Sequence, residues 1–122
     1  MFTTGMRGRA GEALAAAYLE LIGCEIVGRN VRLAGVEIDL LARDVAAQVL
    51  VEVKVRGRSD FGGAVMAVDH PKRRRLRRAA RALEQSGASW VRIDVIAVEL
   101  TPEGAAVRHY RNAITDSGGR EW

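Results

Sequence analysis

Three ionisable residues, Asp39, Glu52 and Lys54, could form a site if a hairpin brings them together. Side chains directly opposed across two strands have Cβ atoms about 4.5–5.5 Å apart. Two carboxylates at about 5 Å, with an effective dielectric constant of about 20, repel by about 3 kcal/mol. One lysine offsets only part of this repulsion, whereas a divalent cation such as Mg²⁺ can bind both carboxylates together with water and substrate phosphate. The alternative is an exposed strand face on which the three side chains are solvated and have no function.

The two stretches that carry these residues alternate apolar and polar side chains. A period of two in residues 35–43 and 48–56 is typical of strands with one buried face. Residues 44–47 form a connection short enough for an antiparallel hairpin. If the turn is centred on the middle of that connection, paired residue numbers sum to 91, and Asp39 lies opposite Glu52.

The order of these residues resembles the Asp…(Asp/Glu)-x-Lys motif of the restriction-endonuclease-like, or PD-(D/E)xK, nuclease superfamily. The wider context resembles the YraN family of small bacterial nuclease-like proteins more closely. That resemblance spans Gly8 to about Ile114 and depends on Gly8–Glu12, Arg29–Asn30, Gly35–Leu41, Val51–Lys54, Phe61–Gly62 and Arg92–Ile96. Two departures leave the charged residues in place: no proline precedes Asp39, and Val55 follows Lys54 where relatives often have threonine.

The resemblance implies a metal-dependent endonuclease that hydrolyses phosphodiester bonds in DNA and is similar to Holliday junction resolvases. Under this hypothesis Mg²⁺, or alternatively Mn²⁺, is bound by Asp39, Glu52 and the Val53 carbonyl, while Lys54 orients or activates the attacking water. In resembling families a glutamate of the first helix helps to hold the metal, and Glu12 occupies the matching position. Glu12 could instead be a first-turn acid that favours the helix dipole. Branched DNA as substrate and a role in repair or recombination come from the family alone. Paired cuts in a four-way junction would require two sites and hence a two-fold dimer.

A second feature is a run of basic residues between positions 72 and 81. Lys72, Arg73, Arg74, Arg75, Arg77, Arg78 and Arg81 are seven basic residues in ten positions, whereas the rest of the chain has 12 basic and 15 acidic residues. This concentrated charge favours contact with a polyanion. The alternative is a solvated helix face whose long arginine stems shield the core. The residues expected to contact nucleic acid are Arg56, Arg58, Lys72, Arg73, Arg74, Arg77, Arg78 and Arg81.

Length and composition indicate a single domain. A chain of 122 residues with 48% hydrophobic residues can bury a core of its own. No apolar run approaches the ~18–20 residues that span a bilayer, and residues 1–9 lack the apolar core of a secretory signal. Cys24 is the only cysteine, which excludes an intrachain disulfide. We therefore expect a cytoplasmic protein without a membrane partner, with a domain over 1–114 and a flexible tail over 115–122.

The pattern as a whole predicts an α/β fold with a restriction-endonuclease-like mixed sheet flanked by helices, in the order α-β-β-β-α-β-β. We expect helices over 6–22 and 69–87, and strands over 24–33, 35–43, 48–56, 90–100 and 105–110. The first helix is predicted to bury a stripe at helical spacing made of Leu14, Ala17, Tyr18 and Leu21. The second is predicted to bury Leu76, Ala79, Ala80 and Leu83, after an N-cap at Asp69 and a first-turn Pro71.

Several polar residues favour structural roles. Asp94 is interpreted as the partner of an arginine and not as a further site acid. Neither His70 nor His109 has a second His or Cys at ligand spacing, so both are interpreted as structural. Residues 112–122 are expected to be poorly ordered.

Two other functions remain open. The chain could be a non-catalytic nucleic-acid-binding module that keeps this fold. It could also be a structural or adaptor protein, for example one that recruits a DNA helicase, with the basic helix as its only contact with nucleic acid. The presence of all four polar site residues, Glu12, Asp39, Glu52 and Lys54, argues against a loss of catalysis.

Overall fold

A computed structural model describes residues 4–57 and 69–115, which form two helices and one five-stranded sheet. The elements are α1 (Thr4–Leu21), β1 (Glu25–Leu33), β2 (Val36–Asp44), β3 (Ala47–Arg56), α2 (His70–Gln85), β4 (Val91–Thr101) and β5 (Gly104–Tyr110). The strands lie in the order β1-β2-β3-β4-β5, and β3 and β4 are parallel while every other pair is antiparallel. Parallel neighbours need a long crossover, and α2 lies in that connection. The expected α/β fold with a mixed sheet and this element order is confirmed.

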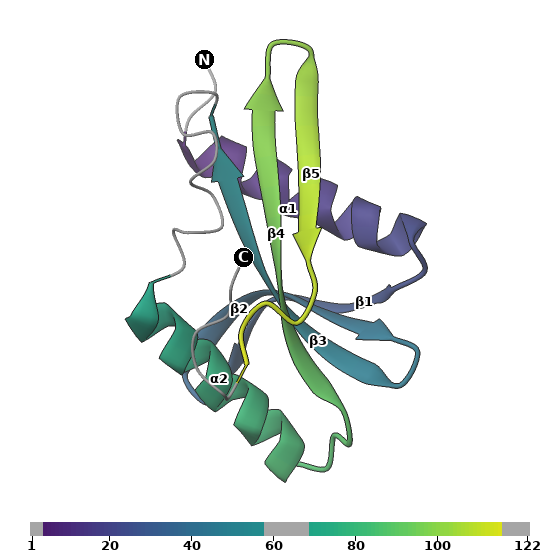
Figure 1. Cartoon of the computed structure of the whole chain (residues 1–122), viewed down its shortest axis with the longest axis vertical. Coiled ribbons are helices and arrows are strands. Elements are labelled where there is room, and N and C mark those ends of the chain that lie inside the picture. Colours follow the sequence, from purple (N-terminus) through teal and green to yellow (C-terminus); the bar gives the residue numbers. More distant parts are fainter. Residues whose placement is uncertain (1–3, 58–68, 116–122) are drawn as a thin grey trace.

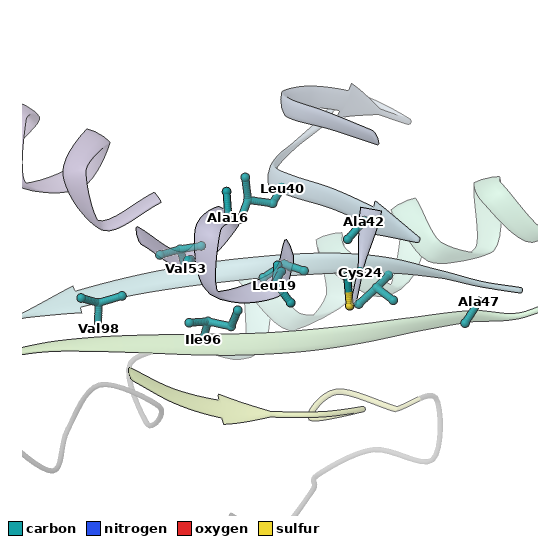
Figure 2. Packing of buried hydrophobic residues seen from close by; sticks show 12 residues of the cluster. Ala16, Leu19, Cys24, Leu40, Ala42, Ala47, Val53, Ile96 and Val98 are labelled. Carbon is teal, nitrogen blue, oxygen red and sulfur yellow. The ribbon is translucent and has the colours of Figure 1, made fainter. Parts of the chain in front are cut away.

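The two helices cover opposite faces of the sheet (Figure 1). One core forms under α1 and contains Ala15, Ala16, Leu19, Leu40, Val49, Val51, Val53, Ile96 and Val98, many of which are labelled in Figure 2. The other forms under α2 and contains Ile38, Leu50, Leu76, Ala79, Ile93 and Val95. Successive side chains of a strand point to opposite faces. Glu52 and Lys54 therefore share the α2 face with Leu50, while the valines of β3 face α1.

The β2–β3 hairpin has the predicted register. Its pairs run from Leu40 with Val51 to Asp44 with Ala47, and the residue numbers of every pair sum to 91. The turn is shorter than the four residues expected, because both strands extend into it and only Val45 and Ala46 remain between them. Val45 has φ +56°, the left-handed conformation that two-residue hairpin turns require.

The predicted buried stripe of α1 is wrong for Leu14, Ala17 and Leu21, which are exposed, whereas Tyr18 is partly buried and packs against the core. Leu14 and Leu21 are 38% and 86% exposed, whereas the buried residues of the helix include Ala15, Ala16 and Leu19. The physical reason is a close approach between helix and sheet, because a Cβ at Gly11 would overlap the Val55 side chain. Small residues at positions 11, 15 and 16 permit this approach, so the helix packs through the face that also buries Leu19 and leaves Leu14 and Leu21 outside.

The second helix matches its prediction closely. The Asp69 side chain caps it by accepting a hydrogen bond from the Lys72 N–H at 3.0 Å, and Pro71 lies in the first turn. Leu76 and Ala79 are buried, and the partly buried Ala80 and Leu83 pack beside them. The helix ends at Gln85, slightly before the expected end at residue 87.

The expectation of a poorly ordered segment from residue 112 onward is wrong at its start. Ala113 and Ile114 are both 3% exposed, and the Ala113 N–H donates to the Ile93 carbonyl at 2.8 Å. Residues 116–122 lie outside the described residues, as do Arg58 and Phe61. Within the described ranges, no helix is long and apolar enough to cross a membrane.

Candidate active site at the fork between β2 and β3

The candidate site lies where β2 and β3 separate. Their ladder ends at the Leu40–Val51 pair, whereas β3 continues beside β4 as far as Arg56 (Figure 1). Beyond the last ladder pair, Asp39 Oδ2 accepts a hydrogen bond from the Val53 N–H at 2.8 Å. A carboxylate thus takes the place of a strand carbonyl, and the Asp39 side chain is held against the edge of β3.

Glu52 is the buried acid of the site and lies between two lysines. It is 4% exposed, and its Oε2 lies 3.3 Å from the Lys54 Nζ. Its Oε1 lies 3.6 Å from the Lys72 Nζ, yet among residues 4–57 and 69–115 this buried oxygen has no hydrogen-bond partner. Buried carboxylate oxygens are normally hydrogen-bonded, so an unsatisfied one calls for an explanation such as an ion or water at that point.

The electrostatics of Asp39 show that the two acids interact. Burial, followed by the negative charge of Glu52, raises the pKa of Asp39 from 3.8 to about 6. The Val53 N–H and the ammonium groups of Lys72 and Lys54 act in the opposite direction. Asp39 and Glu52 therefore form the like-charged pair that the hairpin register predicts, with two lysines that offset only part of their repulsion.

Glu12 lies on α1 beside this pair. Burial and then the charge of Asp39 raise its pKa, while a hydrogen bond from the Asn30 side chain lowers it. Glu12 also lines a pocket of about 240 Å³ together with Lys54 and Arg56. The close packing of α1 on the end of β3 brings the glutamate to the fork.

The oxygen atoms at the fork fit a hard divalent cation. Asp39 and Glu52 supply carboxylates, one of them with the unsatisfied Oε1. The N–H and C=O of a strand residue point to the same side, so the Val53 carbonyl faces the edge where Asp39 lies. Across residues 4–57 and 69–115, no three Asp, Glu, His or Cys side chains are placed to hold a metal ion by themselves. A donor set of two carboxylates, one carbonyl and water suits Mg²⁺, which keeps several of its waters in protein sites.

The basic residues predicted to contact nucleic acid lie in different environments. Lys72 reaches into the site through Glu52, and Arg56 lines the pocket beside Glu12. On α2, Arg74, Arg78 and Arg81 are exposed, whereas Arg73 and Arg77 are half-buried. Arg77 lines a separate pocket of about 230 Å³ between α2 and β4. The exposed part of the basic helix face therefore extends away from the fork along α2.

The sequence does not predict that Lys72 and Asn30 contact the acids of the site. Lys72 was expected only as a nucleic-acid contact, and nothing in its sequence context indicates that its ammonium reaches Glu52. Asn30 belongs to a motif of the family resemblance. Its φ is +50°, and its side chain reaches Glu12. Asparagine tolerates this conformation well, which is the one signal that could have drawn attention to it.

Asp94 and His109 have the structural roles predicted for them. Asp94 is fully buried and accepts hydrogen bonds from Arg92 Nε at 3.0 Å and from the Asn112 N–H at 2.9 Å. His109 Nε2 lies 2.8 Å from Asp94 Oδ2, and its Nδ1 lies 2.9 Å from the Tyr18 hydroxyl. This polar cluster connects α1 to β4 and β5, so it helps to hold α1 against the sheet.

Comparison with known proteins places the chain among related sequences. A family model described as "Uncharacterised protein family UPF0102" matches residues 11–98. This range contains Glu12, Asp39, Glu52, Lys54 and Lys72.

Individual relatives extend the match over most of the chain. A UPF0102 protein of Dechloromonas aromatica is 51% identical over 79 residues, which cover 65% of this chain and 66% of that protein. UPF0102 protein GSU0650 of Geobacter sulfurreducens is 43% identical over 110 residues, covering 87% of this chain and 86% of that protein. A UPF0102 protein of Syntrophus aciditrophicus is 37% identical over 119 residues, covering 93% and 91%.

Among solved structures, the chain is similar to SfsA of Pyrococcus furiosus in complex with Ca²⁺. The TM-score is 0.42 at 15% sequence identity, and the match covers 88% of this chain. The chain spans 63% of the length of that structure.

Proposed function

Because the chain belongs to the UPF0102 family, also called YraN, and brings Asp39, Glu52 and Lys54 to one fork, we propose that it is a metal-dependent DNA endonuclease. The observation that carries this proposal is the state of Glu52, a 4% exposed acid with one carboxylate oxygen that has no hydrogen bond from the part of the chain that the structure describes. A purely structural acid would be expected to have both oxygens satisfied. A cation held between Asp39 and Glu52 satisfies the unbonded oxygen and relieves the repulsion between the acids.

Each residue of the fork has a separate role in the proposed hydrolysis of the phosphodiester bond. Asp39, Glu52 and the Val53 carbonyl would hold Mg²⁺ or Mn²⁺, which when bound polarises the phosphate and lowers the pKa of a bound water. Lys54, whose ammonium lies 3.3 Å from Glu52, orients the attacking water and neutralises charge that develops on the phosphate. Because no three acid side chains among the described residues are placed to hold a metal ion by themselves, we assign Glu12 a supporting role through a water molecule.

DNA is the substrate that best fits the charge on α2. The exposed arginines of this helix, Arg74, Arg78 and Arg81 among them, bind the phosphate backbone and thereby position the duplex without reading its sequence. A preference for branched or four-way junction DNA, in repair or recombination, follows from the family resemblance. Paired cuts in a junction need two sites, and a two-fold dimer of the chain supplies them.

Cleavage assays with substrates of different shape test the proposal. The purified protein is incubated with junction, flap and linear DNA in Mg²⁺, in Mn²⁺ and in chelator. Asp39→Ala and Lys54→Ala should abolish cleavage and retain DNA binding, because the phosphate contacts on α2 remain. Glu103→Ala changes an exposed acid in the β4–β5 turn and should cleave like the wild type.

Two other results of these assays would contradict the proposal. Tight DNA binding with no cleavage of any substrate in any metal would reject the endonuclease and favour a non-catalytic binding module or a helicase adaptor. Cleavage that persists in both Asp39→Ala and Lys54→Ala would place the active site elsewhere.

A further inference from the structure

Lys72 differs from the other basic residues of α2 in the group that it contacts. Its ammonium points to the buried Glu52 and lies 3.6 Å from Oε1. The side chain is nevertheless 27% exposed, so it can reach both the buried acid and the solvent in front of the fork. The cap formed by Asp69 on the Lys72 N–H fixes the backbone from which this side chain extends.

The oxygen that Lys72 approaches is the unsatisfied one. A separation of 3.6 Å is too long for a hydrogen bond, and Glu52 Oε1 has no hydrogen-bond partner within the described ranges. The ammonium therefore neutralises charge at this point without satisfying the oxygen. Lys54 lies closer, at 3.3 Å, and on the other oxygen, Oε2. The two lysines thus occupy different sides of one carboxylate.

We propose that Lys72 is a displaceable counter-ion of the metal site, an inference that depends on the proposed metal-dependent function. In the metal-free protein its ammonium neutralises Glu52 at Oε1, which is the oxygen that a divalent cation would take. When the cation binds, it repels Lys72 from this oxygen. The released ammonium then lies in front of the fork, where it contacts the phosphate that the cation also holds. Metal and substrate binding are coupled in this way through one side chain.

The proposal predicts a result that a simple phosphate contact does not predict. An ammonium and a divalent cation about 6 Å apart repel enough, even at the dielectric constant of water, to weaken binding about tenfold. Lys72→Met removes the competing charge, so the metal-free protein without DNA should bind Mn²⁺ about tenfold more tightly than the wild type. A residue that only contacts phosphate would leave this affinity unchanged, since no phosphate is present.

Matched variants separate the position of the charge from its amount. Arg75→Met removes one positive charge from an exposed position one turn further along α2 and should bind Mn²⁺ within about twofold of the wild type. Lys72→Arg keeps the charge at the same place and should also resemble the wild type. Circular dichroism checks that each variant is folded, and electron paramagnetic resonance of free Mn²⁺ measures the affinity without any reaction.

Two failures can be told apart. If wild type and Lys72→Met bind Mn²⁺ equally, or if Lys72→Met binds it more weakly, Lys72 is not a competing counter-ion, although the metal site stands. If Lys72→Met and Arg75→Met tighten binding equally, only the net charge of the helix matters and the proposal is wrong. If no variant binds Mn²⁺, this proposal and the metal-dependent function fail together.

Discussion

Replacing Asp39 by asparagine should stabilise the metal-free protein at neutral pH. The folded protein raises the pKa of Asp39 from 3.8 to about 6, chiefly through burial and then through the charge of Glu52. At 1.36 kcal/mol for each pKa unit, this difference corresponds to at most about 3 kcal/mol. Asparagine has a similar shape, carries no charge, and its oxygen can still accept the hydrogen bond from the Val53 N–H.

The direction in which the free energy of unfolding changes with pH follows from proton binding at Asp39. Between pH 3.8 and about 6 the folded state binds more protons at Asp39 than the unfolded state does, so the free energy of unfolding falls as the pH rises through this window. Asparagine does not titrate, so the free energy of unfolding of Asp39→Asn does not fall in this way. Wild type and Asp39→Asn should therefore be similarly stable below pH 3.8, and the variant should be more stable by up to about 3 kcal/mol above pH 6.

Urea unfolding in the presence of chelator, repeated from pH 4 to pH 8, measures the difference. Asp44→Asn is the matched control, because it removes another β2 carboxylate whose Oδ2 lies 3.0 Å from Arg92, and it should destabilise the protein. Adding Mg²⁺ should reverse the order of wild type and Asp39→Asn, since a ligand stabilises only the form that binds it. A variant less stable than wild type at pH 8 in chelator, or a difference that is the same at pH 4 and pH 8, would refute the reasoning.

Three further predictions concern the core, the helix packing and the basic face. Asp94→Asn should lower the free energy of unfolding by about 3 kcal/mol at pH 7, because it breaks a buried ion pair. Burial raises the pKa of Asp94, but hydrogen bonds from His109 and Arg92 outweigh it and lower the pKa overall. The loss of stability in Asp94→Asn should therefore shrink as the pH falls towards that pKa, and a loss independent of pH would contradict this. Gly11→Val should destabilise by about 1–3 kcal/mol through overpacking. Gly8→Ala places a Cβ that meets nothing within 4 Å and should stabilise by up to about 1 kcal/mol through its higher helix propensity. Equal effects of the two changes on urea midpoints would show that α1 does not approach the sheet closely. Replacing Arg74 and Arg78 by alanine should flatten the salt dependence of duplex binding by about 0.9 in slope for each lost phosphate contact, and an unchanged slope would mean that this face does not bind DNA.

The hairpin could be predicted from the sequence because its determinants are local. Alternation assigns each residue to a face, and a short connection sets the register, so the pairing of Leu40 with Val51 follows within a few residues of chain. The same reasoning correctly places Asp39 and Glu52 together. The turn has two residues where four were expected, and because one residue is lost at each end the register is unchanged.

The buried face of α1 could not be predicted in the same way. Hydrophobicity favours the stripe with Leu14 and Leu21, but close packing against Val55 requires a small face instead. The cost of leaving leucines exposed is offset by the burial that the close approach permits for Ala15, Ala16 and Leu19. That balance depends on the shape of the sheet, and the spacing of hydrophobic residues along the helix gives no information about this shape.

The contacts of Lys72 and Tyr18 also lie beyond sequence reasoning. Lys72 meets Glu52 only because α2 crosses the face of the sheet that carries this acid. Tyr18 meets His109, 91 residues later, because β5 is the strand next to β4. Both are consequences of how distant elements pack, whereas capping by Asp69 was predictable because donor and acceptor are three residues apart.

The central claim is that Asp39 and Glu52 hold a divalent cation, and Mn²⁺ binding to Glu52→Gln tests it most directly. Glu99→Gln is the matched control, because Glu99 is also 4% exposed and also lies beside a basic group, Arg108, at 3.0 Å, but on β4, where its ladder partner is Arg56 and where it is not one of the proposed metal ligands. We expect Glu52→Gln to bind Mn²⁺ at least about tenfold more weakly than wild type, since it loses one of two anionic ligands, and Glu99→Gln to bind it normally. Equal binding by wild type and Glu52→Gln would contradict the account.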